Sequence, residues 1–133
     1  MATNRIILDS GALSALAREE ESIRVALRLA TAAGVEIVVP APVVTESTTG
    51  DGRRDANVNR ALKATTVAPL DEQTARAAGA LRYQQRRRHA GAIDAMVVAC
   101  ADEQAGSTIY TGDPNDLNAL AAERQRSRIV TIF

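Results

Sequence analysis

The sequence contains few of the residues that build thiolate metal sites, disulfides and aromatic stacking surfaces. Its 133 residues include one cysteine, one histidine, no tryptophan, two tyrosines and one phenylalanine. One cysteine cannot form an internal disulfide, and one cysteine with one histidine cannot build a zinc site. Because aromatic residues are scarce, we expect aliphatic side chains to fill the core, and we do not expect base stacking to dominate any binding of nucleic acid.

A net charge and a long apolar run are also absent. Basic and acidic residues balance at 16 each, so any binding of nucleic acid must depend on a local patch. The sequence starts with no basic-then-apolar signal region, and no apolar run approaches the length that crosses a bilayer. The single thiol, Cys100, lies in an apolar run and is predicted to be buried. These absences predict a soluble cytoplasmic protein without a membrane partner.

Short aliphatic runs alternate with helical patterns along the whole chain. Strands are predicted at residues 5–8, 35–39, 65–68, 108–111 and 129–132. Helices are predicted at residues 12–17, 22–33, 42–48, 57–64, 72–87 and 92–105, and again from Pro114. This alternation predicts an α/β fold in which a mainly parallel five-stranded sheet lies between two helical layers. We expect a single domain over residues 1–133.

Acidic residues lie where predicted strands end and helices begin. Asp9 directly follows the first strand, Asp113 follows the fourth by two residues, and Asp94 lies in the first turn of the apolar helix. Carboxyl ends of parallel strands meet at one sheet edge, where ligands bind in open α/β folds. Glu46 comes three residues after Val43, on the stripe predicted to face the core. Each aspartate also has a structural interpretation, as a helix cap or a first-turn acid.

Carboxylates that converge on one edge of a sheet point to a divalent cation. They repel each other unless a cation lies among them. A site made only of oxygen ligands suits Mg²⁺ or Mn²⁺. Such an ion makes water a better nucleophile and stabilises charge on a phosphoryl group. The acids therefore predict a metal-dependent phosphodiester hydrolase, in which His89 is a solvated loop residue and not a general base.

Four segments resemble the PIN domain family and, in size and layout, the VapC-type toxins of bacterial toxin–antitoxin pairs. They are IILDSGAL around Asp9, PAPVVTES around Glu46, GAIDAMVVACA around Asp94 and IYTGDPNDL around Asp113. The resemblance implies a three-layer α/β/α PIN-like fold and a Mg²⁺- or Mn²⁺-dependent endoribonuclease. These four acids would be its catalytic and metal-binding quartet, with Asp116 as a fifth metal-binding acid.

The resemblance also implies supporting residues and partners. Thr111 matches a hydroxyl residue expected to orient Asp113, and Ser10 matches the polar residue after the first acid. Gly11 departs from the family pattern and is expected to weaken the support around Asp9. The implied partners are an RNA substrate such as a structured tRNA or rRNA, a VapB-type antitoxin whose C-terminal segment covers the site, and a second copy in a homodimer.

A cluster of arginines precedes Asp94, at the end of the helix predicted over residues 72–87. It comprises Arg82, Arg86, Arg87 and Arg88. One interpretation is a surface that contacts RNA phosphates. The other is a solvated helix end whose cations suit the helix dipole. A second alternative concerns the whole chain, which could be a catalytically inactive PIN-like scaffold that binds RNA or protein.

Overall fold

The computed structural model describes residues 3–88, 91–112 and 128–131. Within these ranges the strands are β1 (Arg5–Leu8), β2 (Glu36–Pro40), β3 (Thr66–Ala68), β4 (Ser107–Thr111) and β5 (Arg128–Thr131). The α-helices are α1 (Ser10–Ala17), α2 (Glu21–Ala32), α3 (Ala41–Ser47), α4 (Ala56–Lys63), α5 (Glu72–Gln84) and α6 (Ala92–Asp102). A short 3₁₀ helix, Arg86–Arg88, follows α5.

The strands form one parallel sheet, as predicted. Their order is β3-β2-β1-β4-β5, and every neighbouring pair is parallel. The chain builds the sheet outward from β1 on one side and then crosses over to add β4 and β5 on the other. This reversal creates a topological switch point between β1 and β4, where Leu8 pairs with Tyr110. In open α/β sheets, ligands bind outside the strand ends at such a point.

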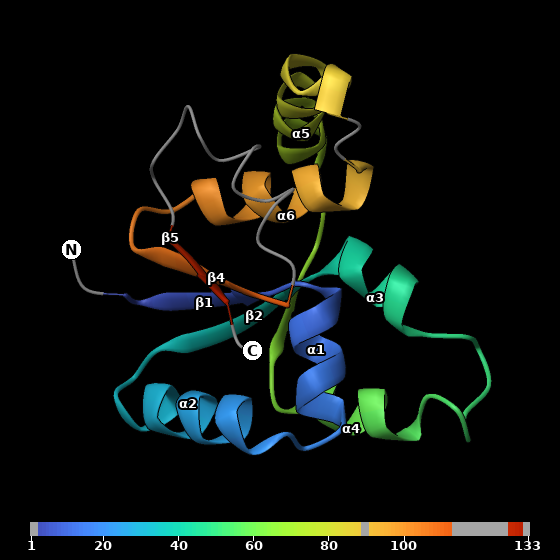
Figure 1. Ribbon diagram of the computed structural model, residues 1–133, viewed down its shortest axis with the longest axis vertical. Helices are drawn as coiled ribbons and strands as arrows, with labels where there is room; N and C mark the ends of the chain where they lie inside the picture. The colour runs from blue at the N-terminus through green and yellow to red at the C-terminus, as the bar shows by residue number, and fades with distance from the viewer. Residues whose placement is uncertain (1–2, 89–90, 113–127, 132–133) are drawn as a thin grey trace.

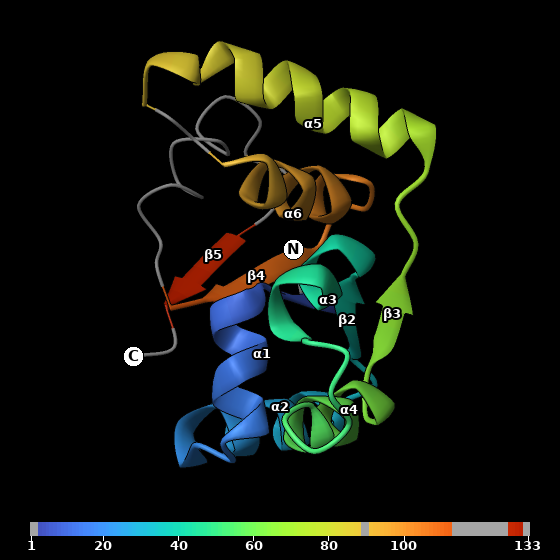
Figure 2. The same cartoon turned by 90° about the vertical axis from the view of Figure 1, so that its right-hand side faces the viewer.

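Helices cover both faces of the sheet, which confirms the predicted three layers. Figure 1 shows α5 and α6 on one side of the sheet and α1, α2 and α4 on the other. Helix α6 packs on the sheet and α5 packs on α6. Helix α3 contacts both α1 and α6, so it lies across the edge at which β1 and β2 end (Figure 2). The three helices α1, α3 and α6 therefore surround the switch point.

The core is aliphatic, as the scarcity of aromatic residues predicted. Ile7, Leu8, Leu13, Val98 and Ile109 have no exposed area. All four residues of β1 are buried, which fits a strand covered on both faces. The predicted apolar helix is α6, and it is buried along most of its length. Burial of this kind fixes the central strand, and with it the residue that follows it.

Some predicted boundaries were wrong. Helix α6 ends at Asp102 and not at residue 105, because the chain turns at Gly106 with a φ of 87°, a conformation that glycine adopts without strain. Helix α5 ends at Gln84, and its predicted last residues form the 3₁₀ helix. The helix predicted from Pro114 lies outside the described residues. None of the described helices combines the length and apolarity that a membrane span requires.

The loop between α3 and α4 is closed by a buried carboxylate. Asp55 accepts hydrogen bonds from the Thr49 N–H at 2.9 Å, the Thr49 hydroxyl at 2.9 Å and the Gly50 N–H at 3.0 Å. These bonds, first of all the backbone bond from Thr49, lower the pKa of Asp55. Because α3 carries Glu46, the loop fixes the chain directly after a candidate site residue.

Asp55→Asn is expected to destabilise the fold at neutral pH and to reduce its sensitivity to acid. A lowered pKa means that the stability from Asp55 is present above the unfolded pKa of about 3.9 and is lost as pH falls through the folded pKa. Urea unfolding of both proteins across acidic and neutral pH measures this. A wild-type curve that runs parallel to that of Asp55→Asn at every pH would contradict it.

Candidate active site

Asp9 is fixed at the carboxyl end of the central strand. It is the N-cap of α1, and its Oδ1 accepts a hydrogen bond from the Ala12 N–H at 2.8 Å. The Gly11 N–H and the Thr111 hydroxyl also donate to this carboxylate. The backbone N–H of Asp9 donates to the Tyr110 carbonyl at 3.3 Å, which ties it to β4 across the switch point. Asp9 therefore caps a helix and also lies where ligands bind in open sheets.

The surroundings of Asp9 disfavour its negative charge. The residue is 7% exposed, and this burial raises the pKa of its carboxyl above the ordinary value. The three hydrogen bonds lower the pKa, and repulsion from the Glu46 carboxylate raises it again. Among the described residues, the groups that act on this charge include no arginine or lysine. An added cation would stabilise the Asp9 carboxylate and offset its repulsion from Glu46.

Glu46 reaches the same edge, but its predicted place on a core-facing stripe was wrong. Its side chain is exposed, while Val43 in the same helix is fully buried. The spacing of residues shows which of them share a face of α3, but not how far neighbouring elements extend over that face. The helix ends one residue later, where the Ser47 hydroxyl donates to the Val43 carbonyl at 2.8 Å. The electrostatic effect on Asp9 still places both acids at one edge.

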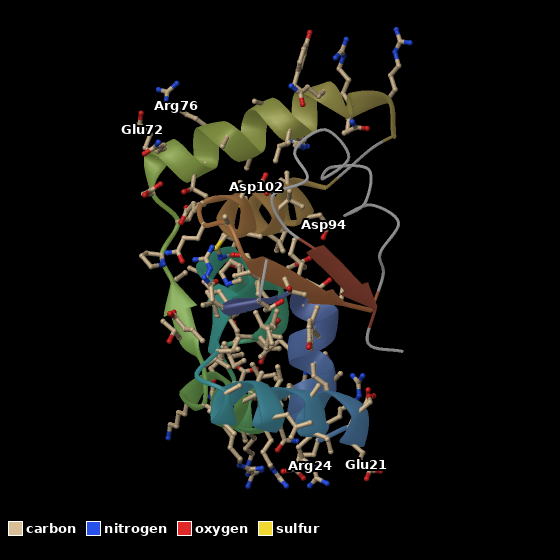
Figure 3. The ribbon with its side chains drawn as sticks, turned by 90° about the vertical axis from the view of Figure 1, so that its left-hand side faces the viewer. Glu21, Arg24, Glu72, Arg76, Asp94 and Asp102 are labelled. Atoms are coloured by element: carbon tan, nitrogen blue, oxygen red, sulfur yellow. The ribbon has the colours of Figure 1, made fainter. Side chains whose placement is uncertain are left out.

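Asp94 lies in the first turn of α6 and is partly exposed. A Cβ added at the N-cap residue, Gly91, would lie 3.9 Å from Asp94 Oδ2, so the carboxylate lies beside the start of the helix. Val97 and Val98, three and four residues later, are fully buried and anchor this helix in the core. Figure 3 shows Asp94 and Asp102 near opposite ends of α6. Helix α6 packs on both α3 and β4, and Figure 1 shows its first turn on the side of the molecule where α3 lies.

Two hydroxyl residues were predicted to support the site. Thr111 ends β4 with no exposed area, and its hydroxyl donates to Asp9. Its predicted role was to orient Asp113, which lies outside the described residues together with Asp116 and His89. Ser10 is the first residue of α1 and is partly exposed. The structure therefore gives Thr111 a direct partner among the candidate acids.

Gly11, which was expected to weaken the support of Asp9, lies beside that carboxylate, and the expectation stays a prediction. Its own N–H is one of the donors to the carboxylate. A Cβ added at Gly11 would lie 3.4 Å from the Gly112 nitrogen and 3.5 Å from Asp9 Oδ1, which are ordinary contacts. The close approach of Gly11 and Gly112 also brings the chain that leads into Asp113 beside Asp9.

The arginine cluster lies at the C-terminal end of α5. Arg82, Arg86 and Arg87 are exposed, while the side chain of Arg88 lies outside the described part of the structure. The first turns of α5 share a polar pocket with the end of α6, so the two helices run antiparallel. Figure 3 agrees, since the labelled residues of α5 lie at the Asp102 end of α6. The arginine cluster consequently lies towards the end of α6 that carries Asp94.

The described acids alone do not complete a metal site. In residues 3–88, 91–112 and 128–131, no three acidic, histidine or cysteine side chains meet closely enough to hold an ion. Asp113 and Asp116, the other predicted metal ligands, lie outside the described residues.

The comparisons with known proteins agree with the order of these elements. The profile of the PIN domain family matches residues 6–123, which include Asp9, Glu46, Asp94 and Asp113. The chain belongs to the PIN domain family. This PIN domain has no match among curated proteins.

Solved structures with the same fold include three complexes. VapBC from Salmonella typhimurium, bound to DNA, has a TM-score of 0.75 and 19% identity over 100% of both chains. VapBC2 from Rickettsia felis, bound to a DNA fragment from its promoter, has a TM-score of 0.75 and 13% identity over 96% of this chain and 98% of that one. FitAcB from Neisseria gonorrhoeae has a TM-score of 0.69 and 17% identity over 96% of this chain and 97% of that one. Likeness at these identities shows the fold.

Two residues of this PIN domain with clear contacts in the structure were not singled out from the sequence. Asp55 closes the loop after α3, and its signal was an aspartate five residues after the Thr49–Gly50 pair in a polar loop. Tyr83 lies three residues before Arg86, a spacing that brings helical side chains together. Both signals are too common to be informative without the fold.

Proposed function

We propose that the protein is a Mg²⁺- or Mn²⁺-dependent endoribonuclease and the toxin of a VapBC-type toxin–antitoxin pair. The observation that carries the proposal is the environment of the Asp9 carboxylate at the switch point. This carboxylate is buried, it accepts three hydrogen bonds, and its pKa is raised. A cation bound beside a carboxylate in this environment would favour its charged form. Membership of the PIN domain family and the fold of the VapBC complexes support the same conclusion.

The donor set fits such an ion. Asp9, Glu46, Asp94, Asp113 and Asp116 would supply only carboxylate oxygens to it. Hard oxygen ligands without thiolate or imidazole suit Mg²⁺ or Mn²⁺. A bound divalent ion supplies a more acidic water and stabilises negative charge on a phosphoryl group.

The chain's own residues prepare the site for this chemistry. The start of α1 and the Thr111 hydroxyl hold the Asp9 carboxylate in one orientation. Glu46 is exposed, so its carboxylate is accessible to an ion or a substrate from solvent. The exposed Arg82, Arg86 and Arg87 supply positive charge on the Asp94 side of the molecule, where RNA phosphates would bind. Cleavage is expected to leave 5′-phosphate and 3′-hydroxyl ends.

The remaining partners follow from the family resemblance. A structured tRNA or rRNA is the expected substrate, and a VapB-type antitoxin is the expected inhibitor. A homodimer is the expected assembly. The inactive PIN-like scaffold remains the second candidate, because Glu46 is exposed and the described acids do not form a complete metal site.

Asp94→Asn is expected to reduce cleavage of total RNA by more than about 100-fold. Loss of a residue that merely supports a metal ligand already costs about 10- to 100-fold, and Asp94 is proposed to be a ligand. Wild type, Asp94→Asn and the control Glu72→Gln are compared with Mg²⁺, Mn²⁺ or EDTA, and the RNA ends are mapped. Glu72 is a matched control because it is an exposed acid in the first turn of α5, away from the site.

Equal cleavage by all three proteins, or cleavage that persists in EDTA, would refute the assignment. A folded wild type that cuts no RNA with either ion would favour the scaffold. In cells, growth arrest on expression should disappear with Asp94→Asn and persist with Glu72→Gln. Arrest that persists in both variants would count against the toxin.

A further inference from the structure

Tyr83 is a large aromatic side chain on the surface, inside the arginine cluster. It lies in the last turn of α5, and 66% of it is exposed. Of the tyrosines, which are both described, Tyr110 is half-buried and packs against the core. A chain with so few aromatic residues therefore leaves one of them on the surface, among cations. Tyrosine is enriched at binding interfaces, because its ring is apolar and its hydroxyl is polar.

The Arg86 side chain already forms a layered pair with this ring. The guanidinium carbon of Arg86 lies 4.1 Å from the centre of the Tyr83 ring. The Arg86 Nη1 also donates to the Tyr83 carbonyl at 2.9 Å, so one hydrogen bond holds the guanidinium in place. The two planar groups are thus ordered before any ligand binds, which reduces the entropy lost on binding.

The surroundings of the pair are polar and positively charged. Gln84, Gln85, Arg86 and Arg87 line an open recess of about 400 Å³, and Arg82 is exposed beside Tyr83. Amide side chains can donate to and accept from the edge of a base, while arginines can contact phosphates. Unpaired RNA bases stack on aromatic rings and on guanidinium planes.

We propose that Tyr83 and Arg86 form a stacking platform for one unpaired base of the RNA, with Arg82 and Arg87 on the adjacent phosphates. The proposal rests on the proposed function, because it assigns part of the substrate to a surface on the Asp94 side. Arg87 and Asp94 are seven positions apart, so the chain limits their Cα separation to about 25 Å. The platform can therefore lie no more than a few nucleotides' length from Asp94, so that one RNA strand can reach both. The enzyme would select RNA with an unpaired nucleotide at that distance.

RNA is favoured over a protein partner because of the planar pair. An acidic protein segment would be attracted by the arginines, but it would gain little from an exposed ring that a guanidinium already covers. A base has a flat face that matches both planes. It also carries the phosphates that the flanking arginines can contact.

The experiment measures binding of a labelled single-stranded RNA in the Asp9→Asn background, so that the RNA is not cut. Adding Tyr83→Ala should raise the Kd about 5- to 100-fold, whereas Tyr83→Phe should keep the affinity. Arg76→Ala is the matched control, because it removes an exposed cation from the opposite end of α5. It should raise the Kd much less than Tyr83→Ala does.

A second set of RNAs, each with one base removed, identifies the stacked position. Removal of that base should weaken RNA binding to the parent protein. Tyr83→Ala should bind the RNA with and without that base equally well. Equal Kd values for the parent and Tyr83→Ala would overturn the proposal. An equal loss of RNA affinity in Tyr83→Phe and in Tyr83→Ala would also overturn it. A change in oligomeric state with Tyr83→Ala would also overturn it, because the ring would then belong to a protein interface.

The outcomes distinguish a failure of the stacking platform from a failure of the proposed function. Tyr83-dependent binding together with a wild type that never cuts RNA would support the platform and reject the nuclease. Metal-dependent cleavage with a KM and a Kd that do not change in Tyr83→Ala would support the nuclease and reject the platform.

Discussion

Asp9→Asn is expected to abolish RNA cleavage without unfolding the protein. The loss in kcat should exceed about 100-fold, because even residues that support a metal ligand contribute about 10- to 100-fold. Asparagine keeps an acceptor oxygen for the Ala12 N–H, and it is as good an N-cap as aspartate. Single-turnover cleavage of a labelled RNA measures the loss, and circular dichroism checks the fold.

The same variant should be at least as stable as the wild type in the absence of metal. The pKa of Asp9 is raised, so wild-type stability is greatest below the unfolded pKa of about 3.9 and falls as pH rises through the folded pKa. Asparagine carries no charge and avoids this loss. The urea midpoint of Asp9→Asn should therefore equal or exceed that of the wild type at neutral pH.

Asp71→Asn is the matched control for this effect. Asp71 caps α5 as Asp9 caps α1, and its carboxylate accepts from the Thr74 N–H at 2.8 Å. Its pKa is lowered, chiefly by that bond, so its contribution is present above the unfolded pKa and is lost in acid. Asp71→Asn should keep cleavage and lower the urea midpoint at neutral pH. The reverse pattern, an active Asp9→Asn and an inactive Asp71→Asn, would contradict the assignment of Asp9 to the active site.

The sheet could be predicted from the sequence because its signals are local. The RIIL run of β1 has apolar residues on both faces, which only a strand covered on both faces accommodates. Alternation with helices then gives a parallel order with few alternatives. The cap Asp9 was predicted from the position of an aspartate before a helix, and the structure confirms it. Such features depend on residues close together in the chain.

Exposure at the ends of elements could not be predicted in the same way. Glu46 shares a helical face with Val43, but the layer that covers Val43 does not cover Glu46. The Tyr83–Arg86 pair was missed because scarce aromatics argued against stacking for the chain as a whole. Composition averages over positions, whereas binding requires only one exposed ring in the right surroundings.

Removal of divalent ions is expected to stop cleavage, and their return should restore it. The buried charge of Asp9 and its repulsion from Glu46 are both relieved by a cation, so Mg²⁺ or Mn²⁺ should also raise the Tm. An ion at about 100 times its Kd stabilises the fold by about 2.7 kcal/mol. Thermal unfolding with each ion and with EDTA measures this in wild type, Asp9→Asn and Asp71→Asn. Asp71→Asn should respond like the wild type, and Asp9→Asn should respond far less.

The pH dependence of the metal effect tests whether the ion binds Asp9 itself. A proton and a cation compete for the same carboxylate, and the pKa of Asp9 is raised. The Kd for the ion should therefore rise as pH falls through that raised pKa, at a higher pH than an ordinary aspartate would give. An ion that shifts the Tm of Asp9→Asn as much as that of the wild type would bind elsewhere. Asp9 would then be only the cap of α1, and the raised pKa would reflect burial without a role in catalysis.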